Sequence, residues 1–244
     1  MPKFFVRQDK IEDKKIIITG DDAFHISRAL RMAKGEQVMV CDMQCNEYDC
    51  VLSEFNTDNV VAEIVSVRKI DNEPPVKVYL FQALPKGDKL DTVIQKAVEC
   101  GAFEITPFES ERCVVKVKAD VEAKKTERRN RIALEAAKQC GRGYVPRVNP
   151  TVDFKTAVDK ACTCDLCVLC YEGEETYSLK TLLQNDKLAG TVSVFIGSEG
   201  GFSLDEVEYA VKKGMKSVSL GKRILRTETA SSFVLSCIVY ESEL

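Results

Sequence analysis

The stretch Thr191-Val-Ser-Val-Phe-Ile-Gly-Ser-Glu-Gly-Gly-Phe-Ser-Leu-Asp-Glu206 decides the fold of this chain. It begins with an apolar run typical of a buried strand, passes through three glycines and reaches Ser203, which can form a helix capping box with Glu206. Strand, glycine-rich loop and helix together predict one unit of an α/β fold. The glycines either bring the backbone close to a ligand or simply make a tight turn. The loop is neither a Walker loop nor G-x-G-x-x-G, which disfavours a triphosphate or a dinucleotide.

A second loop, Leu220-Gly-Lys-Arg-Ile-Leu-Arg-Thr-Glu-Thr-Ala230, follows another strand-like stretch and leads into an apolar C-terminal helix. Arg223 and Arg226 suit an anion or a developing negative charge, and Thr227 suits the cap of the last helix. Ligands of parallel sheets bind at the carboxyl ends of the strands. The two loops therefore predict one shared site.

Outward from these loops, apolar strands alternate with helices over residues 73–244, which predicts a parallel sheet with helices on both faces. Residues 71–75, Asp-Asn-Glu-Pro-Pro, interrupt regular structure and mark a domain boundary. Residues 1–72 instead show short strands of a small β-barrel or sandwich. One helix interrupts them, expected from Asp21 or Asp22 to about Ala33, with Arg28 and Arg31 on its outer face.

Composition places the chain among cytoplasmic globular proteins. It has 244 residues, 45% of them hydrophobic, and we find neither an apolar run long enough to span a bilayer nor a signal peptide. The 11 cysteines are expected to be reduced thiols, most of them buried. Residues 162–170, Cys-Thr-Cys-Asp-Leu-Cys-Val-Leu-Cys, imitate a metal-ligand run, but a strand there would scatter the sulfurs to opposite faces, so no metal is expected.

The charge distribution indicates a nucleic-acid partner, although the net charge is −3. Residues 112–147 carry 11 Lys or Arg against 4 Asp or Glu, which is the electrostatic footprint of phosphate binding or merely a solvated helix face. No nucleophile elbow or Ser–His–Asp arrangement is present, and His25 is the only histidine. The reaction is therefore expected to depend on positioning and on an already activated donor rather than on proton shuttling.

Several motifs together resemble one family. They are the two loops already quoted, Phe4-Phe-Val6, residues 25–31 followed by Lys34-Gly-Glu36, Leu84-Pro-Lys-Gly-Asp-Lys89, Gln95-Lys-Ala97, Ser110-Glu-Arg112 with Val114-Val-Lys116, and Glu135-Ala-Ala137 with Gly141-Arg142. The chain is thus similar to the RsmE family, the small-subunit ribosomal RNA uracil-N3 methyltransferases of the SPOUT superfamily. The resemblance covers nearly the whole chain.

This resemblance implies a PUA-like RNA-binding barrel over residues 1–72 and a SPOUT methyltransferase domain over residues 73–244. A deep trefoil knot and the cofactor loops are expected mainly within residues 165–244. The resemblance further implies S-adenosylmethionine as the cofactor and a homodimer. The target it implies is a uridine in the decoding region of 16S ribosomal RNA, within the assembled small ribosomal subunit. No membrane and no metal are expected as partners.

The site residues follow from the same resemblance. The cofactor is expected at Leu169, Tyr171, Glu172, Ile196, Gly197, Ser198, Glu199, Gly200, Gly201, Leu220, Gly221, Ile224, Leu225, Arg226, Thr227, Thr229 and Ala230. Arg226 is expected to stabilise the charge of a uracil imide anion, with Glu199 or Glu228 organising the site. RNA is expected at Arg28, Arg31, Arg112, Lys116, Arg128 and Arg142.

Three alternatives stay open at this point. One is a SPOUT-type methyltransferase that acts on transfer RNA or on another ribosomal position. Another is a non-catalytic RNA-binding factor of ribosome assembly that keeps the fold, and a more distant one is an NAD-dependent oxidoreductase.

Overall fold

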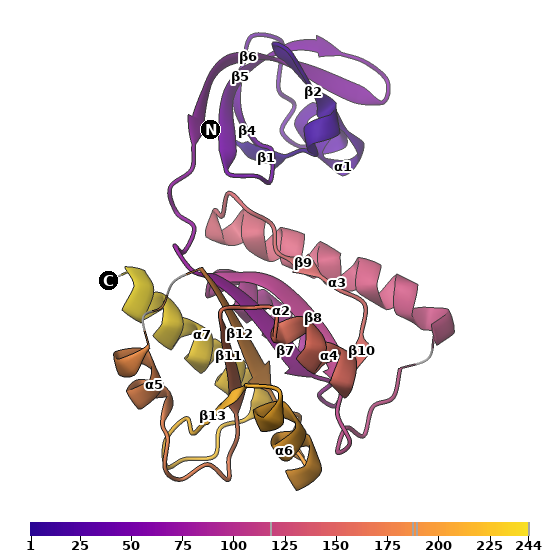
Figure 1. Cartoon of the computed structure of the whole chain (residues 1–244). Helices are drawn as coiled ribbons and strands as arrows, with labels where there is room; N and C mark the ends of the chain where they lie inside the picture. Colours follow the sequence, from indigo (N-terminus) through magenta and orange to yellow (C-terminus); the bar gives the residue numbers. More distant parts are fainter. Residues whose placement is uncertain (118, 187, 189, 244) are drawn as a thin grey trace. The chain divides into compact units, whose positions relative to one another are not determined.

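Two sheets form the framework of the computed structural model, which describes residues 1–117, 119–186, 188 and 190–243 (Figure 1). The chain divides into two compact units. Unit 1 comprises residues 1–73 and 137–145, and unit 2 comprises residues 74–136 and 146–244. Among the described residues, no helix combines the length and the apolarity needed to cross a membrane.

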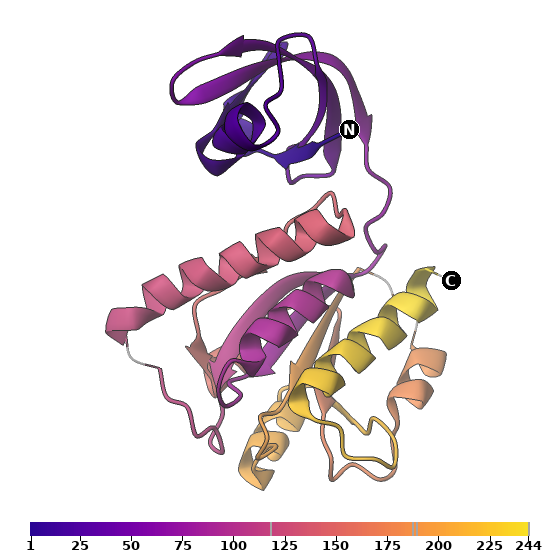
Figure 2. The same ribbon diagram turned by 180° about the vertical axis from the view of Figure 1, so that it is seen from behind.

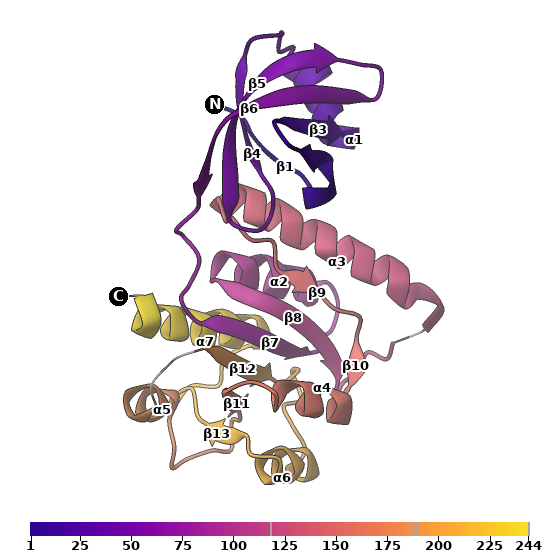
Figure 3. The same cartoon turned by 45° about the horizontal axis from the view of Figure 1, so that its top comes forward.

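Unit 1 is a curled, mixed six-stranded sheet, seen along its open side in Figure 3. Its strands follow the order β1 (Lys3–Phe5), β4 (Gln37–Cys41), β5 (Asn46–Phe55), β6 (Asn59–Lys69), β3 (Lys15–Thr19) and β2 (Ile11–Glu12). Only the pairing of β1 with β4 is parallel. Alternate residues of β3, Ile16 and Ile18, are fully buried in one core, as the period of two in a half-buried sheet requires. The short strands expected within residues 1–72 are present and form this curled sheet.

The helix of unit 1 is shorter than expected. α1 (Gly20–Phe24) continues as a π-helical turn, η2 (His25–Ala29), and does not reach Ala33. The amide of Leu30 donates to the His25 carbonyl and the amide of Met32 to that of Ile26, so the turn widens. Arg31 then takes a left-handed φ of 52°, which ends the helix. Neither Asp21 nor Asp22 is the N-cap; Thr19 holds that position.

Unit 2 is a parallel seven-stranded sheet. The strand order is β10 (Val152–Asp153), β8 (Ala102–Glu109), β7 (Lys77–Ala83), β12 (Thr191–Ile196), β11 (Leu166–Cys170) and β13 (Lys216–Val218), and β9 (Arg147–Val148) pairs with β8. The helices are α2 (Lys89–Glu99), α3 (Ala119–Cys140, its last residues in unit 1), α4 (Phe154–Ala161), α5 (Leu179–Asn185), α6 (Leu204–Lys212) and α7 (Thr227–Glu243). α4 and α6 cover the face seen in Figure 1, whereas α2 and α7 cover the face seen in Figure 2. This is the expected parallel sheet with helices on both faces.

The strand order places loops from distant parts of the chain at one edge of the sheet. β12 lies between β7 and β11, and β13 lies on the other side of β11. All these pairs are parallel, so the carboxyl ends of β7, β11, β12 and β13 point the same way. The trefoil knot that the family resemblance implies stays a prediction.

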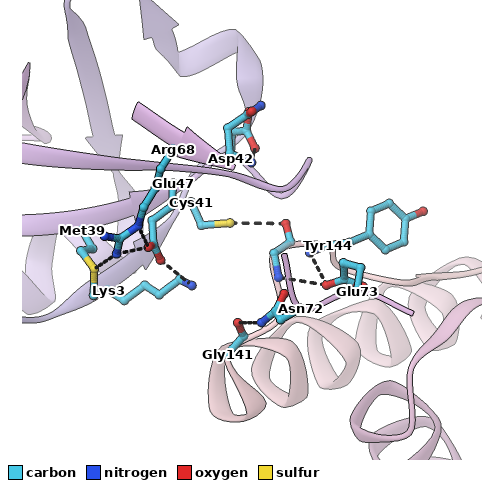
Figure 4. A network of polar contacts seen from close by, with 12 residues as sticks. Lys3, Met39, Cys41, Asp42, Glu47, Arg68, Asn72, Glu73, Gly141 and Tyr144 are labelled. Carbon is cyan, nitrogen blue, oxygen red and sulfur yellow. Dashed lines mark hydrogen bonds and ion pairs between the residues drawn. The ribbon is translucent and has the colours of Figure 1, made fainter. Parts of the chain in front are cut away.

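Residues 137–145 pack into unit 1, although the expected division at residues 72 and 73 assigns them to the second domain. Figure 4 shows how they are held. The Glu73 carboxylate accepts hydrogen bonds from the amides of Gly143 and Tyr144, at 3.0 and 3.1 Å, and from the guanidinium of Arg142 at 2.6 Å. The Asn72 side chain donates to the Gly141 carbonyl at 2.8 Å. A carboxylate this well satisfied keeps the segment in place.

Candidate active site

A cavity of about 520 Å³ opens at the carboxyl ends of β11, β12 and β13. This volume lies within the roughly 300–1,000 Å³ typical of small-molecule sites. Three segments form most of its wall: residues 170–172 after β11, residues 196–201 after β12, and residues 219–227 before and at the start of α7. Lys89, at the start of α2, and Ala230, in the first turns of α7, complete it. Both of the predicted loops line this one cavity.

The glycine loop needs glycine at Gly201. This residue has a left-handed φ of 64°, and its amide donates to the Ser198 carbonyl at 3.0 Å, which closes the loop on itself. A Cβ at Gly201 would collide with the carboxylate of Glu172, which lines the same cavity. The absence of a side chain thus lets two walls of the cavity meet.

The capping box predicted at the start of α6 is present. The Ser203 hydroxyl accepts from the Glu206 amide at 3.3 Å, and the Glu206 carboxylate accepts from the Ser203 amide at 3.0 Å. The second oxygen of Glu206 accepts from the Glu111 amide at 2.8 Å. Glu206 therefore anchors the β8–α3 connection as well as the end of the glycine loop.

Glu199 points to α2 and is held there. Its carboxylate accepts from the Lys89 ammonium at 2.7 Å and from the Lys86 amide at 3.2 Å. Burial by itself raises the pKa of Glu199, but the hydrogen bonds from Lys89 and the backbone outweigh it, so the net shift of the pKa is downward. An ionised carboxylate with a lowered pKa is a weak base at neutral pH. Its geometry supports an organising role.

Arg226 is one of three exposed cations that line the cavity, together with Lys222 and Arg223. It is exposed, it lines the cavity, and within the described part of the chain no hydrogen bond or ion pair engages its guanidinium. Its own carbonyl accepts from the Ala230 amide at 2.8 Å, so its backbone is fixed by the first turn of α7. A fixed backbone with an uncommitted guanidinium suits the stabilisation of negative charge on a ligand.

The other predicted site residues divide into those that line the cavity and those that do not. All predicted cofactor residues line the cavity except Leu169 and Thr229. Leu169 is fully buried one residue before the strand end, and Thr229 faces solvent. Glu228, predicted to be catalytic, does not line the cavity, and one of its carboxylate oxygens is buried without a partner among the described residues.

Five residues of the cavity wall were not among the predicted ones: Lys89, Cys170, Ser219, Lys222 and Arg223. Cys170 lies between the predicted residues Leu169 and Tyr171, and the other three after Lys89 lie within or next to the second loop. Lys89 follows β7, whose carboxyl end lies at the same edge of the sheet, so the strand-end rule offered a signal for it.

The predicted RNA contacts differ in what they do. Arg28 is exposed on η2, and Arg31 is exposed two residues beyond the end of η2. In unit 2, the Arg112 guanidinium donates to the Gly200 carbonyl at 3.1 Å, Lys116 lies 3.8 Å from Glu109, and Arg128 lies 2.6 Å from Asp91. The side chain of Arg142 is only 6% exposed and bound to Glu73. Arg142 is thus unavailable to a phosphate. Its guanidinium instead holds the Glu73 carboxylate.

The cysteines in residues 162–170 do not form a metal site in the described structure. Cys167 and Cys170 lie buried on β11, whereas Cys162 and Cys164 precede the strand. Burial raises the pKa of Cys164 to about 11, which keeps it a neutral thiol. All eleven cysteines are free, and no group of three or more metal-ligating side chains occurs among the described residues.

Comparison with known proteins agrees with this fold and site. A family model described as an RNA methyltransferase domain matches residues 72–239, and one described as an RNA methyltransferase PUA domain matches residues 18–65. The fold and the site thus define an RNA methyltransferase with a PUA domain, which confirms the expected fold class.

The relatives narrow this class further. The chain is 35% identical, over its full length, to ribosomal RNA small subunit methyltransferase E of Bacillus subtilis, of which 98% is covered. It is similar to the Neisseria gonorrhoeae ribosomal RNA small subunit methyltransferase E bound to S-adenosyl methionine (29% identity, TM-score 0.84, 98% of this chain and 96% of that one). A Legionella pneumophila methyltransferase in complex with the same cofactor is 30% identical, with a TM-score of 0.83 over 97% and 96% of the two chains. The chain belongs to the ribosomal RNA small subunit methyltransferase E family.

Proposed function

We propose that this protein methylates N3 of a uridine in 16S ribosomal RNA, with S-adenosylmethionine as the methyl donor. The observation that carries the proposal is the cavity at the strand ends, where the glycine loop and the uncommitted Arg226 face one space. The names of the relatives support the choice of substrate and cofactor. The alternative of an NAD-dependent oxidoreductase has no comparable support.

The residues of the cavity fit this cofactor. Ile196, Leu220 and Leu225 give it an apolar wall for a purine, and the carboxylates of Glu172 and Glu199 suit the hydroxyl and cationic groups of the molecule. The closeness of Gly201 to Glu172 provides a cradle that a Cβ would fill. When bound, the cofactor supplies an activated methyl group on a sulfonium.

The protein's own contribution is then positioning and charge stabilisation. Loss of the N3 proton leaves negative charge on the uracil oxygens, and Arg226 stabilises that charge from the start of α7. Glu199 holds the glycine loop against α2 through Lys89. The carboxylate of Glu199 is already engaged by the Lys89 ammonium and the Lys86 amide, so the N3 proton leaves to solvent rather than to this group.

Two further parts of the proposal concern partners. Phe233 and Tyr240 lie seven residues apart on one face of α7 and are 41% and 65% exposed, which supports a homodimer formed through this helix. Light scattering tests the dimer, because a monomeric mass at micromolar concentration would contradict it.

We further propose a cytoplasmic location, where ribosomal RNA is modified.

The decisive experiment is an assay of purified protein with S-adenosylmethionine and three RNA samples: assembled small subunits lacking the modification, free 16S ribosomal RNA, and bulk transfer RNA. We expect N3-methyluridine in 16S RNA, detected by mass spectrometry of nucleosides, with the assembled subunit as the best substrate. Methylation of transfer RNA would support another SPOUT-type activity. Cofactor binding without methyl transfer to any sample would support an assembly factor.

Arg28 and Arg31 are proposed to bind RNA phosphates. Phe24, on the same segment, is 67% exposed and offers an aromatic face to an unpaired base. Changing either arginine to Gln should weaken RNA binding and reduce the slope of log K against log salt by about 0.7–0.9 per lost phosphate contact. Filter binding over a salt series measures this slope. Lys14 is another exposed cation of unit 1, and Lys14→Gln is the control. An equal loss of RNA binding in this variant would mean that only the net charge of unit 1 matters.

A further inference from the structure

Gln82 carries a polar amide at a buried position of β7, where its sequence neighbours are apolar. It lies near the carboxyl end of β7, it is fully buried, and its neighbours Phe81 and Ala83 are buried apolar residues. An amide removed from water costs free energy unless it is hydrogen-bonded. The contacts of this side chain therefore have to explain its presence.

The amide nitrogen of Gln82 connects two distant parts of unit 2. It donates to the Thr227 hydroxyl at 2.8 Å, across 145 positions of sequence, to the Ala83 carbonyl at 2.9 Å and, at a longer 3.5 Å, to the Gly197 carbonyl. The Thr227 hydroxyl in turn donates to the Gly197 carbonyl at 2.6 Å. Because this hydroxyl accepts one hydrogen bond and donates the other, its orientation is fixed.

Thr227 and Gly197 line the cavity, whereas Gln82 lies behind them and does not. Gly197 opens the glycine loop after β12, and Thr227 opens α7. The relay thus sets the distance between two walls of the cavity from behind. A side chain that only filled space would not control that distance.

The carbonyl oxygen of the same side chain lowers the net contribution of the amide to stability. Gln82 Oε1 is buried and accepts no hydrogen bond from any described residue. A buried acceptor left without a donor is destabilising, so an apolar residue of similar length at this position would remove a cost as well as a benefit.

We propose that Gln82 is a positioning residue for cofactor binding: acting through Thr227, it holds the glycine loop and the start of α7 at the spacing that S-adenosylmethionine requires. The inference rests on the proposed function for the identity of the cofactor. A positioning role differs from a purely structural role in one measurable respect. Loss of the Gln82 amide should weaken the affinity for the cofactor without lowering the stability of the fold.

The test compares Gln82→Met and Thr227→Val, which remove the relay but keep side-chain size, with Thr227→Ser, which keeps the hydroxyl. Thr106→Val is the control for a lost structural hydrogen bond, since Thr106 is buried on the adjacent β8 and bonds to Asn149 at 2.8 Å outside the cavity. Calorimetry with S-adenosylmethionine alone gives the affinity, and thermal unfolding gives the stability of each full-length variant.

Gln82→Met and Thr227→Val should each weaken cofactor affinity about tenfold, and the double variant should be no weaker than either. The melting temperature of Gln82→Met should be no lower than that of the unchanged protein. Thr106→Val should bind like the unchanged protein, and Thr227→Ser should recover most of the affinity that Thr227→Val loses. In the methylation assay, KM for the cofactor should rise more than kcat falls.

Wild-type affinity in Gln82→Met, or additive losses in the double variant, would overturn the inference and leave the proposed function intact. A Gln82→Met variant that lost affinity only in proportion to its stability would also overturn it. If the unchanged protein did not bind S-adenosylmethionine, the proposed function would fail and the inference with it. Methylation at another RNA position would change the proposed function alone, because the binding measurement contains no RNA.

Discussion

Arg226→Ala should lower kcat for methyl transfer about 100-fold and change cofactor affinity by no more than about twofold. The guanidinium faces the cavity with no partner among the described residues, whereas the backbone of Arg226 is fixed by α7. Its removal therefore withdraws charge stabilisation from the uracil anion without opening the glycine loop. Single-turnover assays with small subunits, together with calorimetry of the cofactor, measure the two quantities separately.

The pH dependence sharpens this prediction. If Arg226 favours the deprotonated base, the variant needs a higher pH to reach the same fraction of anion, so its deficit should narrow as the pH rises above neutral. Arg226→Lys should recover part of the rate, since it keeps the charge but loses the planar fork of the guanidinium. Lys212→Ala, on the exposed face of α6, controls for net charge. A pH-independent deficit would contradict the proposed role and indicate a contact with RNA phosphate.

The sequence predicted the two loops because their signals are local. Glycines, a capping box and polar residues after an apolar strand can each be recognised within about ten residues, and parallel topology then brings the loops to one edge. The relay from Gln82 and the ion pair of Lys89 with Glu199 were missed because each joins residues more than one hundred positions apart. A lone Gln in an apolar strand carries no sign of its partner.

The two predictions that the structure contradicts fail for a similar reason. The helix expected to reach Ala33 follows its apolar period up to Ile26, but a π-helical turn and the left-handed φ of Arg31 end it early, and an apolar period carries no sign of either. Arg142 looked like part of a basic RNA-binding surface because Glu73, its partner, lies 69 positions away. Local charge density therefore overestimates how many cations are free to bind a phosphate.

Gly201→Ala should weaken cofactor affinity at least tenfold and lower the free energy of unfolding by about 1–2 kcal/mol. The stability loss comes from placing a Cβ on a residue with a φ of 64°. The affinity loss has a different origin: the methyl group takes the space of the Glu172 carboxylate, which must move away from the cavity wall. Chemical denaturation and calorimetry with S-adenosylmethionine measure the two effects.

The variant Gly214→Ala separates the loss of stability from the loss of cofactor affinity. Gly214 has a φ of 99° and open space where its Cβ would lie, and it follows α6 outside the cavity. This variant should lose stability to a similar extent and bind the cofactor normally. Glu172→Ala should weaken binding by itself, but in the Gly201→Ala background it should add little, because the same carboxylate is already displaced. Fully additive losses would mean that the glycine acts on the cofactor directly, and a Gly201→Ala variant that binds normally would remove the cradle from the site.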